Sequence, residues 1–336
     1  MELEQQISLQ PYNTFGVEAR AAYFVKIKST EHLQNLLTNK IPPVFILGGG
    51  SNLLLTQDIE QLVLKNEIKG VQIDSQSATH AVVKVGGGEN WHEFTQWCLK
   101  ENLGGIENLS LIPGTVGAAP IQNIGAYGVE LKDVFIKLEA VELQTGKFVT
   151  FTHSDCRFGY RDSIFKNDYK GKYFITHIYL KLTRHQHRID TSYGAIQQIL
   201  EQKGITEPTI REVSEAVIAI RSSKLPDPAR LGNSGSFFKN PVIPNDQLLE
   251  LQKNFPGIVS YPVKNDQSKV PAGWLIEQCG WKGRRVGNTG AHKHQALVLV
   301  NYGGATGQEI LALAREIGKS VEKKFGIKLQ TEVNII

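Results

Sequence analysis

The chain has 336 residues, of which 41% are hydrophobic and 21% charged, a composition typical of a globular protein and unlike a disordered or fibrous one. Its formal net charge of +4 suits an anionic substrate, but no run of lysine and arginine is dense enough to indicate nucleic-acid binding. The three cysteines are far apart and form no C-x-x-C pair, which favours neither a disulfide framework nor a zinc site.

The compartment can also be inferred from composition. Residues 1–10, MELEQQISLQ, lack the apolar core of a signal peptide, and no apolar run is long enough to span a bilayer. Widely separated single cysteines are typical of a reducing compartment. We therefore expect a cytoplasmic protein of about two domains, with neither membrane nor nucleic acid as a partner.

The first third of the chain alternates apolar segments with glycine-rich loops. Helical or alternating spacing of the apolar residues distinguishes helices from strands there. The predicted elements are a helix at Thr30–Asn39, strands at Pro43–Leu47, Leu53–Leu55 and Ala81–Val85, a structural turn at Gly86–Gly88, and an amphipathic helix marked by Trp91, Phe94, Trp97 and Cys98.

The first glycine-rich loop, Gly48–Asn52, follows a buried strand. Consecutive glycines allow several backbone amides to converge on an anion, so the loop could bind phosphate. The dinucleotide-binding fingerprint fails here, because strand residues resume at Leu53 and no third glycine follows at the required spacing.

The longest glycine-rich segment is Ile112–Gly128, IPGTVGAAPIQNIGAYG. It has no charged side chain and no helical or strand period. Glycine suits positions with positive φ or close approach of a ligand, and proline removes a backbone donor. The segment is therefore predicted to be an irregular wall that faces a partner such as a cofactor, with a packed crossover loop as the alternative.

A predicted hairpin and strand dominate the middle of the chain, and helices dominate the rest. Thr209 and Glu212 form the pattern of a capping box, and Gly326 ends the last helix. The predicted elements are a hairpin over Leu138–Thr152 turning at Thr145–Gly146, a strand at Phe174–Leu182, helices at Tyr193–Lys203 and Thr209–Arg221, a linker at Lys224–Arg230, helices at Asn245–Asn254, Ala272–Cys279 and Gly307–Phe325, and strands at Ala296–Asn301 and Leu329–Ile336.

Three short patterns imitate known sites. Gly318–Ser320 resembles the end of a Walker loop, but Leu313 stands where glycine is required. The pairs His185/His187 and His292/His294 have metal-ligand spacing but lack a third ligand nearby, so no metal is predicted. Gly232–Ser236 resembles the nucleophile elbow of a serine hydrolase, yet its fifth position is serine rather than glycine, and it remains a weak alternative.

Three polar groups are candidates for catalysis or binding. Arg157, Tyr160, Arg161 and Asp162 crowd into the segment CRFGYRDS, for which an exposed salt-bridged turn is an equally good explanation. Ser236, Lys239 and Asn240 surround two phenylalanines in GSFFKNP. Glu332 is an isolated acid in the closing segment, where it either points to solvent or lines a site.

Several of these motifs, taken in order, carry a family resemblance. From about Asn13 to Glu332 the chain resembles the UDP-N-acetylenolpyruvoylglucosamine reductases, including the longer class that closes a tyrosine, here Tyr193, over the substrate. Departures from some relatives are Ala118 and Ala119 in the glycine-rich wall and Thr331 and Asn334 beside the final acid. The motifs are NTFG, GGGSN, IPGTVGAAPIQNIGAYG, CRFGYRDSIFK, KLPDP, GSFFKNP, AGWLIEQCG and the terminal EV.

The resemblance implies an α+β fold with an FAD-binding domain of the vanillyl-alcohol-oxidase (PCMH) type in two lobes, plus an inserted α/β substrate-binding domain. It assigns residues 1–70 to the first FAD-binding subdomain and residues 71–221, with 327–336 returning, to the second. Residues 222–326 would form the substrate-binding domain. The strand-rich middle and the compositional break near Lys224–Arg230 agree with this division.

The resemblance also implies a reaction. NADPH reduces FAD, and reduced FAD gives a hydride to the enolpyruvyl group of the sugar nucleotide, forming UDP-N-acetylmuramate for peptidoglycan synthesis. Hydride addition leaves negative charge on the inner carbon and its carboxylate. Arg161 and Glu332 match the family residues that stabilise this charge, and Ser236 matches the proton donor. No metal is required, since flavin supplies the redox chemistry.

The remaining site residues follow from the same resemblance. The partners implied are FAD, NADPH and the enolpyruvyl sugar nucleotide, and the protein is expected to be a monomer. The substrate-binding residues are Tyr160, Tyr193, Lys224, Asn240, Tyr261, Lys282 and Gln295. The FAD-binding residues are Gly48, Gly49, Gly50, Ser51, Asn52, Ile112, Pro113, Gly114, Gly117, Ala118, Ile121, Gln122, Asn123, Gly125, Ala126, Tyr127 and Arg221.

Three other functions remain as alternatives. A related flavin oxidase would consume oxygen without a need for NADPH. A non-catalytic sensor of sugar nucleotides could use the same fold. A serine hydrolase using Ser236 is the most remote of the three.

Overall fold

The computed structural model describes residues 3–39 and 41–336. The chain divides into two compact units, and both are built from separate stretches of sequence. The first comprises Met1–Ile7, Ala21–Gly49 and Ile59–Arg221, and the second comprises Ser8–Arg20, Gly50–Asp58 and Ser222–Ile336. The predicted three-domain division stays a prediction.

A four-stranded sheet and one helix form one layer of the first unit. Strands β2 and β3 both pair with β5 in parallel. Leu33 and Leu36 of the helix lie at helical spacing and pack on Leu62 and Leu64 of the central strand. In sheet order the strands are β1 (Glu4–Ser8), β2 (Arg20–Ile27), β5 (Ile59–Asn66) and β3 (Val44–Leu47), and the helix is α1 (Thr30–Leu37).

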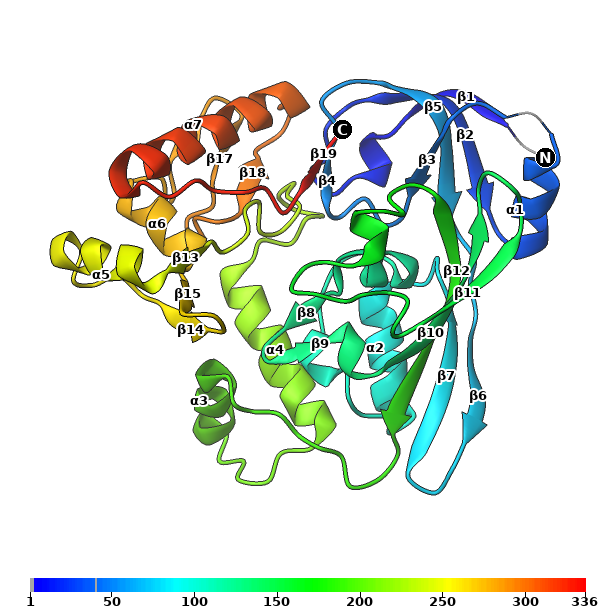
Figure 1. The fold of residues 1–336 in the computed structure, drawn as a ribbon, viewed down its shortest axis with the longest axis horizontal. Helices are drawn as coiled ribbons and strands as arrows, with labels where there is room; N and C mark the ends of the chain where they lie inside the picture. Colours follow the sequence, from blue (N-terminus) through cyan, green and yellow to red (C-terminus); the bar gives the residue numbers. More distant parts are fainter. Residues whose placement is uncertain (1–2, 40) are drawn as a thin grey trace. The chain divides into compact units, whose positions relative to one another are not determined.

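A five-stranded antiparallel sheet is the larger layer of the same unit (Figure 1). Leu138, Ile178 and Val85 lie opposite one another on its three central strands, and all three are buried. Trp91 and Phe94 of helix α2 (Trp91–Lys100) belong to the same core. In sheet order the strands are β11 (Phe148–Thr152), β10 (Phe135–Glu142), β12 (Tyr173–Thr183), β7 (His80–Gly86) and β6 (Val71–Gln76).

The remainder of the first unit is a helix pair and a small two-stranded sheet. Helices α3 (Gly194–Gln202) and α4 (Ile210–Lys224) share an apolar cluster that also contacts Tyr127. The capping box predicted at α4 is present, because Thr209 N donates to Glu212 Oε2 at 2.7 Å and Glu212 N donates to Thr209 Oγ1 at 3.4 Å. The two strands are β8 (Gly125–Ala126) and β9 (Val129–Glu130).

The second unit contains three small sheets, three α-helices and the 3-10 turn Gln10–Tyr12. Its strand β4 (Leu53–Leu54) pairs in parallel with the last strand, β19 (Asn334–Ile335). The other sheets are β13 (Val242–Pro244), β15 (Gln267–Lys269) and β14 (Tyr261–Val263), and β16 (Arg285–Val286), β17 (Thr289–Ala291) and β18 (Leu299–Asn301). The helices are α5 (Asn245–Asn254), α6 (Ala272–Gln278) and α7 (Gly307–Phe325).

The long helix α7 has a defined signal at each end. Thr306 and Glu309 form a capping box at its start. At its end Gly326 adopts a left-handed conformation, φ 64°, which glycine reaches without steric cost. Within the described part of the chain, no helix combines the length and apolar character needed to cross a membrane.

Most predicted elements are present, but two strands are shorter than predicted. Of Ala296–Asn301 only Leu299–Asn301 is strand, and of Leu329–Ile336 only Asn334–Ile335. The flanking residues pair through single bridges, such as Val298 with Ser236 and Thr331 with Phe238, so no continuous ladder forms. The hairpin turn at Thr145–Gly146 is confirmed, whereas of the predicted turn at Gly86–Gly88 only Gly87 and Gly88 are turn, because Gly86 is the last residue of strand β7.

Candidate active site

Backbone hydrogen bonds and a single bridge, Asn90 to Thr115, join the start of the glycine-rich wall to the segment before helix α2. Trp91 N donates to Gly114 O at 3.0 Å, Val116 N to Glu89 O at 2.9 Å, and Gly117 N to Gly87 O at 2.8 Å. The wall then turns through a 3-10 helix, Val116–Gln122, and ends at Asn123 with φ 42°. The irregular conformation predicted from its sequence is confirmed.

Close backbone packing explains the glycines on both sides of this junction. A Cβ atom on Gly117 would lie 2.9 Å from Gly87 O, and one on Gly87 would lie 2.7 Å from Asn66 Nδ2. Asn66 is buried, and it donates to Ile175 O at 2.9 Å and accepts from Ile68 N at 3.2 Å. Any larger residue at Gly87 or Gly117 would displace this backbone.

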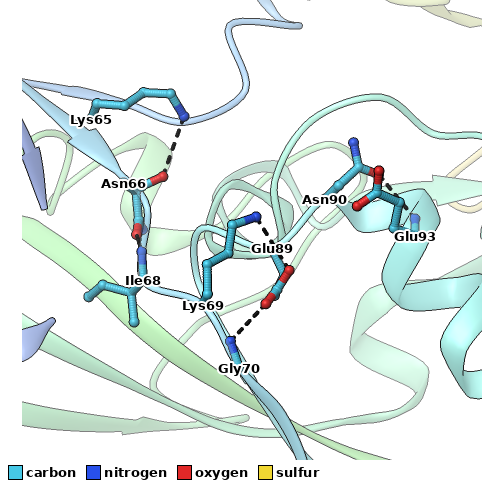
Figure 2. Close-up of polar contacts among 8 residues, drawn as sticks. All are labelled: Lys65, Asn66, Ile68, Lys69, Gly70, Glu89, Asn90 and Glu93. Atoms are coloured by element: carbon cyan, nitrogen blue, oxygen red, sulfur yellow. Dashed lines mark hydrogen bonds and ion pairs between the residues drawn. The ribbon is translucent and has the colours of Figure 1, made fainter. Parts of the chain in front are cut away.

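Figure 2 shows how the neighbouring turn is held. Glu89 accepts from Gly70 N at 2.7 Å and pairs with Lys69 at 3.3 Å. The next residue, Asn90, caps helix α2 by accepting from Glu93 N at 3.0 Å. The turn on which the wall rests is thus fixed by side chains as well as by backbone.

Gly48 and Gly49, the residues of the first glycine-rich loop that belong to the first unit, contact the glycine-rich wall. A Cβ atom on Gly49 would lie 2.7 Å from Gly114 Cα, and one on Gly48 would lie 2.8 Å from Thr115 Oγ1. Within residues 3–39 and 41–336, the buried Thr115 hydroxyl has no hydrogen-bond partner, and the amides of Gly49, Gly114 and Thr115 donate to no other group. Unpaired amides and a hydroxyl at one junction fit the diphosphate of FAD.

Arg221 and Tyr127 lie beside the wall. Arg221 Nε donates to Leu111 O at 3.2 Å. Burial lowers the pKa of this guanidinium, a hydrogen bond with Tyr127 opposes that shift, and the positive charge of Arg161 adds to it. Burial also raises the pKa of the Tyr127 phenol. Since arginine remains charged in proteins, two guanidinium groups contribute positive potential to this part of the unit.

Arg161 is held against the wall by its own turn. Gly159 and Asp162 exchange backbone hydrogen bonds of 3.0 and 3.3 Å, and Arg161 between them has φ 53°. Its Nη2 donates to Gly125 O at 2.5 Å, and its guanidinium lies 5.4 Å from the Tyr160 ring centre. The guanidinium is therefore directed to a predicted FAD-binding residue.

The alternative interpretation of this segment, an exposed salt-bridged turn, applies to Arg157 rather than to Arg161. Arg157 pairs with Asp168 at 3.2 Å, and about two-thirds of each side chain is exposed (67% and 62%). Such a pair contributes little to stability. Arg157 and Arg161 thus have distinct environments within one short segment.

Ser236 and Glu332 are carried by neighbouring segments of the second unit. Ser236 bridges to Val298, and the next residue, Phe237, accepts a hydrogen bond from Glu332 N at 2.8 Å. Phe237 is fully buried and packs edge-on against Phe15, with ring centres 6.3 Å apart. The two phenylalanines of GSFFKNP thus anchor the segment, leaving Ser236 half-buried.

These contacts bear on two other interpretations, a serine hydrolase that uses Ser236 and a metal site at the histidine pairs. Among the described residues, no histidine is hydrogen-bonded to Ser236 Oγ, which disfavours a serine hydrolase. In the same part of the chain, no group of three His, Cys, Asp or Glu side chains lies close enough to hold a metal ion. His187 instead contacts Thr183 Oγ1 at 2.7 Å, and His292 is buried beside His294.

The predicted substrate-binding residues of the second unit come from several elements. Asn240 Oδ1 accepts from Ala272 N at 2.9 Å, and a Cβ atom on Gly273 would lie 2.8 Å from Gln295 Oε1, so both amides lie at the start of α6. Lys282 pairs with Glu277 at 2.9 Å, and Tyr261 is exposed on β14. Lys224 is the last residue of α4.

In the first unit, Tyr160 and Tyr193 are about half exposed (45% and 46%). The Tyr193 ring stands edge-on to Tyr127, with centres 5.0 Å apart and planes at 84°. Sequence reasoning missed Asn66 and Asn108, two buried asparagines behind the wall. No local pattern could have found them, because their burial depends on packing between distant segments.

The chain is similar to several known proteins. Residues 227–336 match the model of the UDP-N-acetylenolpyruvoylglucosamine reductase C-terminal domain, and residues 21–152 match an FAD binding domain. A UDP-N-acetylenolpyruvoylglucosamine reductase of Flavobacterium johnsoniae is 52% identical over 100% of both chains. That of Pseudomonas aeruginosa is 49% identical over 100% of this chain and 99% of its own.

A solved structure extends the comparison to the fold. The crystal structure of the UDP-N-acetylenolpyruvylglucosamine reductase MurB from Thermus caldophilus is 25% identical and has a TM-score of 0.70 over 100% of this chain and 99% of its own. The predicted α+β FAD-binding fold and the FAD cofactor are thereby confirmed. The chain belongs to the UDP-N-acetylenolpyruvoylglucosamine reductase family.

Proposed function

We propose that this protein reduces the enolpyruvyl group of UDP-N-acetylglucosamine enolpyruvate to give UDP-N-acetylmuramate, with NADPH as the reductant. A hydride adds to the terminal carbon of the double bond and a proton adds to the inner carbon. The observation that carries the proposal is the contact of Arg161 with Gly125 in the glycine-rich wall, 2.5 Å from Nη2 to the carbonyl oxygen.

The FAD site is proposed at the junction of the two glycine-rich loops. The amides of Gly49, Gly114 and Thr115, with the Thr115 hydroxyl, would bind the diphosphate, and Arg221 would bind close by. Bound FAD supplies the chemistry of hydride transfer. The protein's own contribution is to position the reacting groups and to stabilise charge.

Arg161 is proposed to stabilise the negative charge that develops on the substrate. Hydride addition leaves that charge on the inner carbon and its carboxylate. A fixed guanidinium forms two parallel hydrogen bonds to a carboxylate. A preorganised donor of this kind is worth roughly 10²- to 10³-fold in turnover.

Glu332 and Ser236 are proposed to complete the reaction from neighbouring segments of their unit. A protonated Glu332 could donate a hydrogen bond to the developing enediolate. Ser236 would give its proton to the inner carbon. A serine hydroxyl is a weak acid, so this step needs a strongly basic carbon or a proton relay.

Several polar side chains are proposed to bind the sugar nucleotide. Lys224 offers a compact charge to its diphosphate, and Asn240 and Gln295 offer directional hydrogen bonds. Tyr193 would close over the same region, while Tyr160, Tyr261 and Lys282 provide further contacts. We also propose a cytoplasmic monomer that needs no metal.

The test is oxidation of NADPH by the purified protein, followed at 340 nm with and without the enolpyruvyl sugar nucleotide. We expect a yellow protein with an oxidised-flavin spectrum and oxidation that requires the sugar nucleotide. A colourless protein that cannot be reconstituted with FAD would exclude the proposal. Oxygen consumption that needs no NADPH would indicate an oxidase instead.

A further inference from the structure

Asn108 joins two segments of the first unit from behind the glycine-rich wall. Its side chain is 1% exposed, and Nδ2 donates to Tyr127 O at 2.9 Å and to Asp190 O at 2.9 Å. Because both partners are carbonyls, the flipped amide would turn its oxygen toward two acceptors. The orientation of the amide is therefore fixed by chemistry.

The two segments bear residues with different proposed roles. Tyr127 belongs to the wall, whereas Asp190 begins a short stretch that ends at Tyr193. Asp190 Oδ1 accepts from Ser192 N at 2.9 Å and from its hydroxyl at 2.6 Å, which folds this stretch into a compact turn. Tyr193 then rests edge-on against Tyr127.

Gly128 allows the two segments to approach each other. Its φ is 88°, and a Cβ atom there would lie 3.0 Å from Asp190 Oδ2. A substituted residue would be strained by the backbone and crowded by the carboxylate. Asn108 is the side chain among the described residues that donates to both segments.

Asn108 itself is presented from a rigid support. It lies in the 3-10 turn Glu107–Leu109, and Leu109 O accepts from the indole of Trp91 at 2.9 Å. Ser110 Oγ contacts Ser214 Oγ of α4 at 2.7 Å. The amide is thus anchored to two helices, α2 and α4, while its hydrogen bonds reach outward to the two loops.

We propose that Asn108 is a positioning residue that fixes the Asp190–Tyr193 segment against the wall, and thereby sets the affinity for the diphosphate-bearing substrate. The inference rests on the proposed function, in which Tyr193 closes over that diphosphate. Without the two donated bonds, both carbonyls lose a partner and the segment can leave the wall. Substrate binding must then restore the position of Tyr193, which weakens the apparent affinity.

The test compares Asn108→Ser, Asn108→Asp and a control in the FAD-loaded protein. Asn108→Ser replaces the two amide N–H donors by one shorter hydroxyl without adding charge, and Asn108→Asp replaces the donors by acceptors. The control is Thr176→Val, which deletes a buried hydrogen bond of 3.1 Å to Glu139 O in the same unit and removes no bond to Tyr127 or Asp190. Hydrogen exchange of residues 188–193 is measured without substrate, and KM and kcat are measured with it.

We expect both Asn108 variants to keep FAD and to exchange faster at residues 188–193 than the control. KM for the sugar nucleotide should rise about tenfold, the effect of losing one to two hydrogen bonds, while kcat changes less than about threefold. Equal exchange and equal KM in Asn108→Ser and Thr176→Val would overturn the inference. If both Asn108 variants lose FAD while Thr176→Val keeps it, the inference is also overturned, since Asn108 would then act on the cofactor loop.

The two proposals fail in different ways. If the wild-type protein oxidises no NADPH with the sugar nucleotide, the proposed function is wrong. The exchange rates at residues 188–193 still decide whether Asn108 holds that segment, because they are measured without substrate.

Discussion

Two arginines of one segment show that the surroundings of a side chain determine which role it can have. Arg157 and Arg161 both have positive φ, 46° and 53°, and lie four positions apart. Arg157 ends in a solvent-exposed pair with Asp168, and Arg161 ends on the backbone of the wall. Only the second environment is suited to stabilise charge on a bound substrate.

Arg161→Lys tests the role of the guanidinium. Lysine keeps the positive charge but loses the planar fork that can bind a carboxylate with two bonds. We expect turnover to fall by about 10²-fold or more, with NADPH still able to reduce the flavin. Arg157→Lys is the matched control and should change turnover by less than twofold; equal losses in both variants would contradict the role of Arg161.

Ser236→Ala separates reduction of the flavin by NADPH from reduction of the sugar nucleotide by the flavin. The variant should accept electrons from NADPH at the wild-type rate, because that half-reaction does not involve the serine. Reoxidation of the flavin by the sugar nucleotide should slow by at least about 10²-fold. Stopped-flow absorbance at 450 nm measures both steps, Ser75→Ala on exposed β6 is the control, and an unchanged reoxidation rate would remove Ser236 from its proposed role.

At the scale of elements, helix α7 is one whose two ends are determined by the local sequence. Thr306 N donates to Glu309 Oε2 at 2.7 Å, Glu309 N donates to Thr306 Oγ1 at 3.2 Å, and Gly326 closes the other end. The hydrogen bonds from the Thr306 amide and hydroxyl lower the pKa of Glu309 below its ordinary value of 4.5.

Thr306→Ala removes the hydroxyl of this capping box. We expect the free energy of unfolding to fall by about 1 kcal/mol at pH 7, the usual effect of losing an N-cap side chain. A carboxylate with a lowered pKa stabilises the fold above its unfolded pKa, and this contribution is lost as the pH falls through the folded pKa. The difference between variant and wild type should therefore shrink below about pH 4.5.

Urea denaturation at several pH values measures this difference. The control is Ser29→Ala at helix α1, where Ser29 Oγ accepts from His32 N and no carboxylate completes a capping box. Its deficit should not shrink in acid. If the two variants show the same pH dependence, the contribution of Glu309 is smaller than inferred.

The elements predicted correctly are those with strong local signals. Helices α5 and α7 have the predicted bounds, and the capping box of α4 is present. Strands β1, β2, β5 and β6 were not predicted, because their pairing depends on partners distant in sequence rather than on a local pattern. The short strands β13–β17 contain two or three residues each, too few for any periodicity.

Only the site residues that lie within recognisable sequence motifs could be predicted. The resemblance supplied the glycine loops and the three proposed catalytic residues. It could not supply Asn66 or Asn108, since an asparagine at the end of a strand or in a turn is ordinary unless its tertiary partners are known. Their importance follows from burial and from the carbonyls that they contact.

At the scale of the whole molecule, cofactor binding should contribute to stability. FAD at about one hundred times its Kd adds about 2.7 kcal/mol to the free energy of unfolding if it binds only the folded state. For a protein of this size that corresponds to a rise in Tm of about 4 °C. Removal of FAD should lower Tm by this amount, and reconstitution should restore it, as measured by differential scanning calorimetry.

Gly49→Ala provides the test of where this stabilisation originates. Its Cβ atom would lie 2.7 Å from Gly114 Cα, so the two loops must separate. We expect a lower FAD content per protein, read from the 450 nm absorbance, and no rise in Tm with added FAD. Gly318→Ala is the control, since a Cβ atom there meets nothing within 4 Å; full FAD binding by Gly49→Ala would contradict the loop assignment.

The discontinuous second unit has a consequence for the order of folding. During synthesis the ribosome releases nearly all of the first unit, up to Arg221, before the last segment of the second exists. Ser8–Arg20 and Gly50–Asp58 must wait for Ser222–Ile336, and β4 obtains its partner β19 only when about 280 further residues have been made. The second unit is therefore expected to be the slow step of folding, and the exposed β4 edge is the segment for which a chaperone would compete.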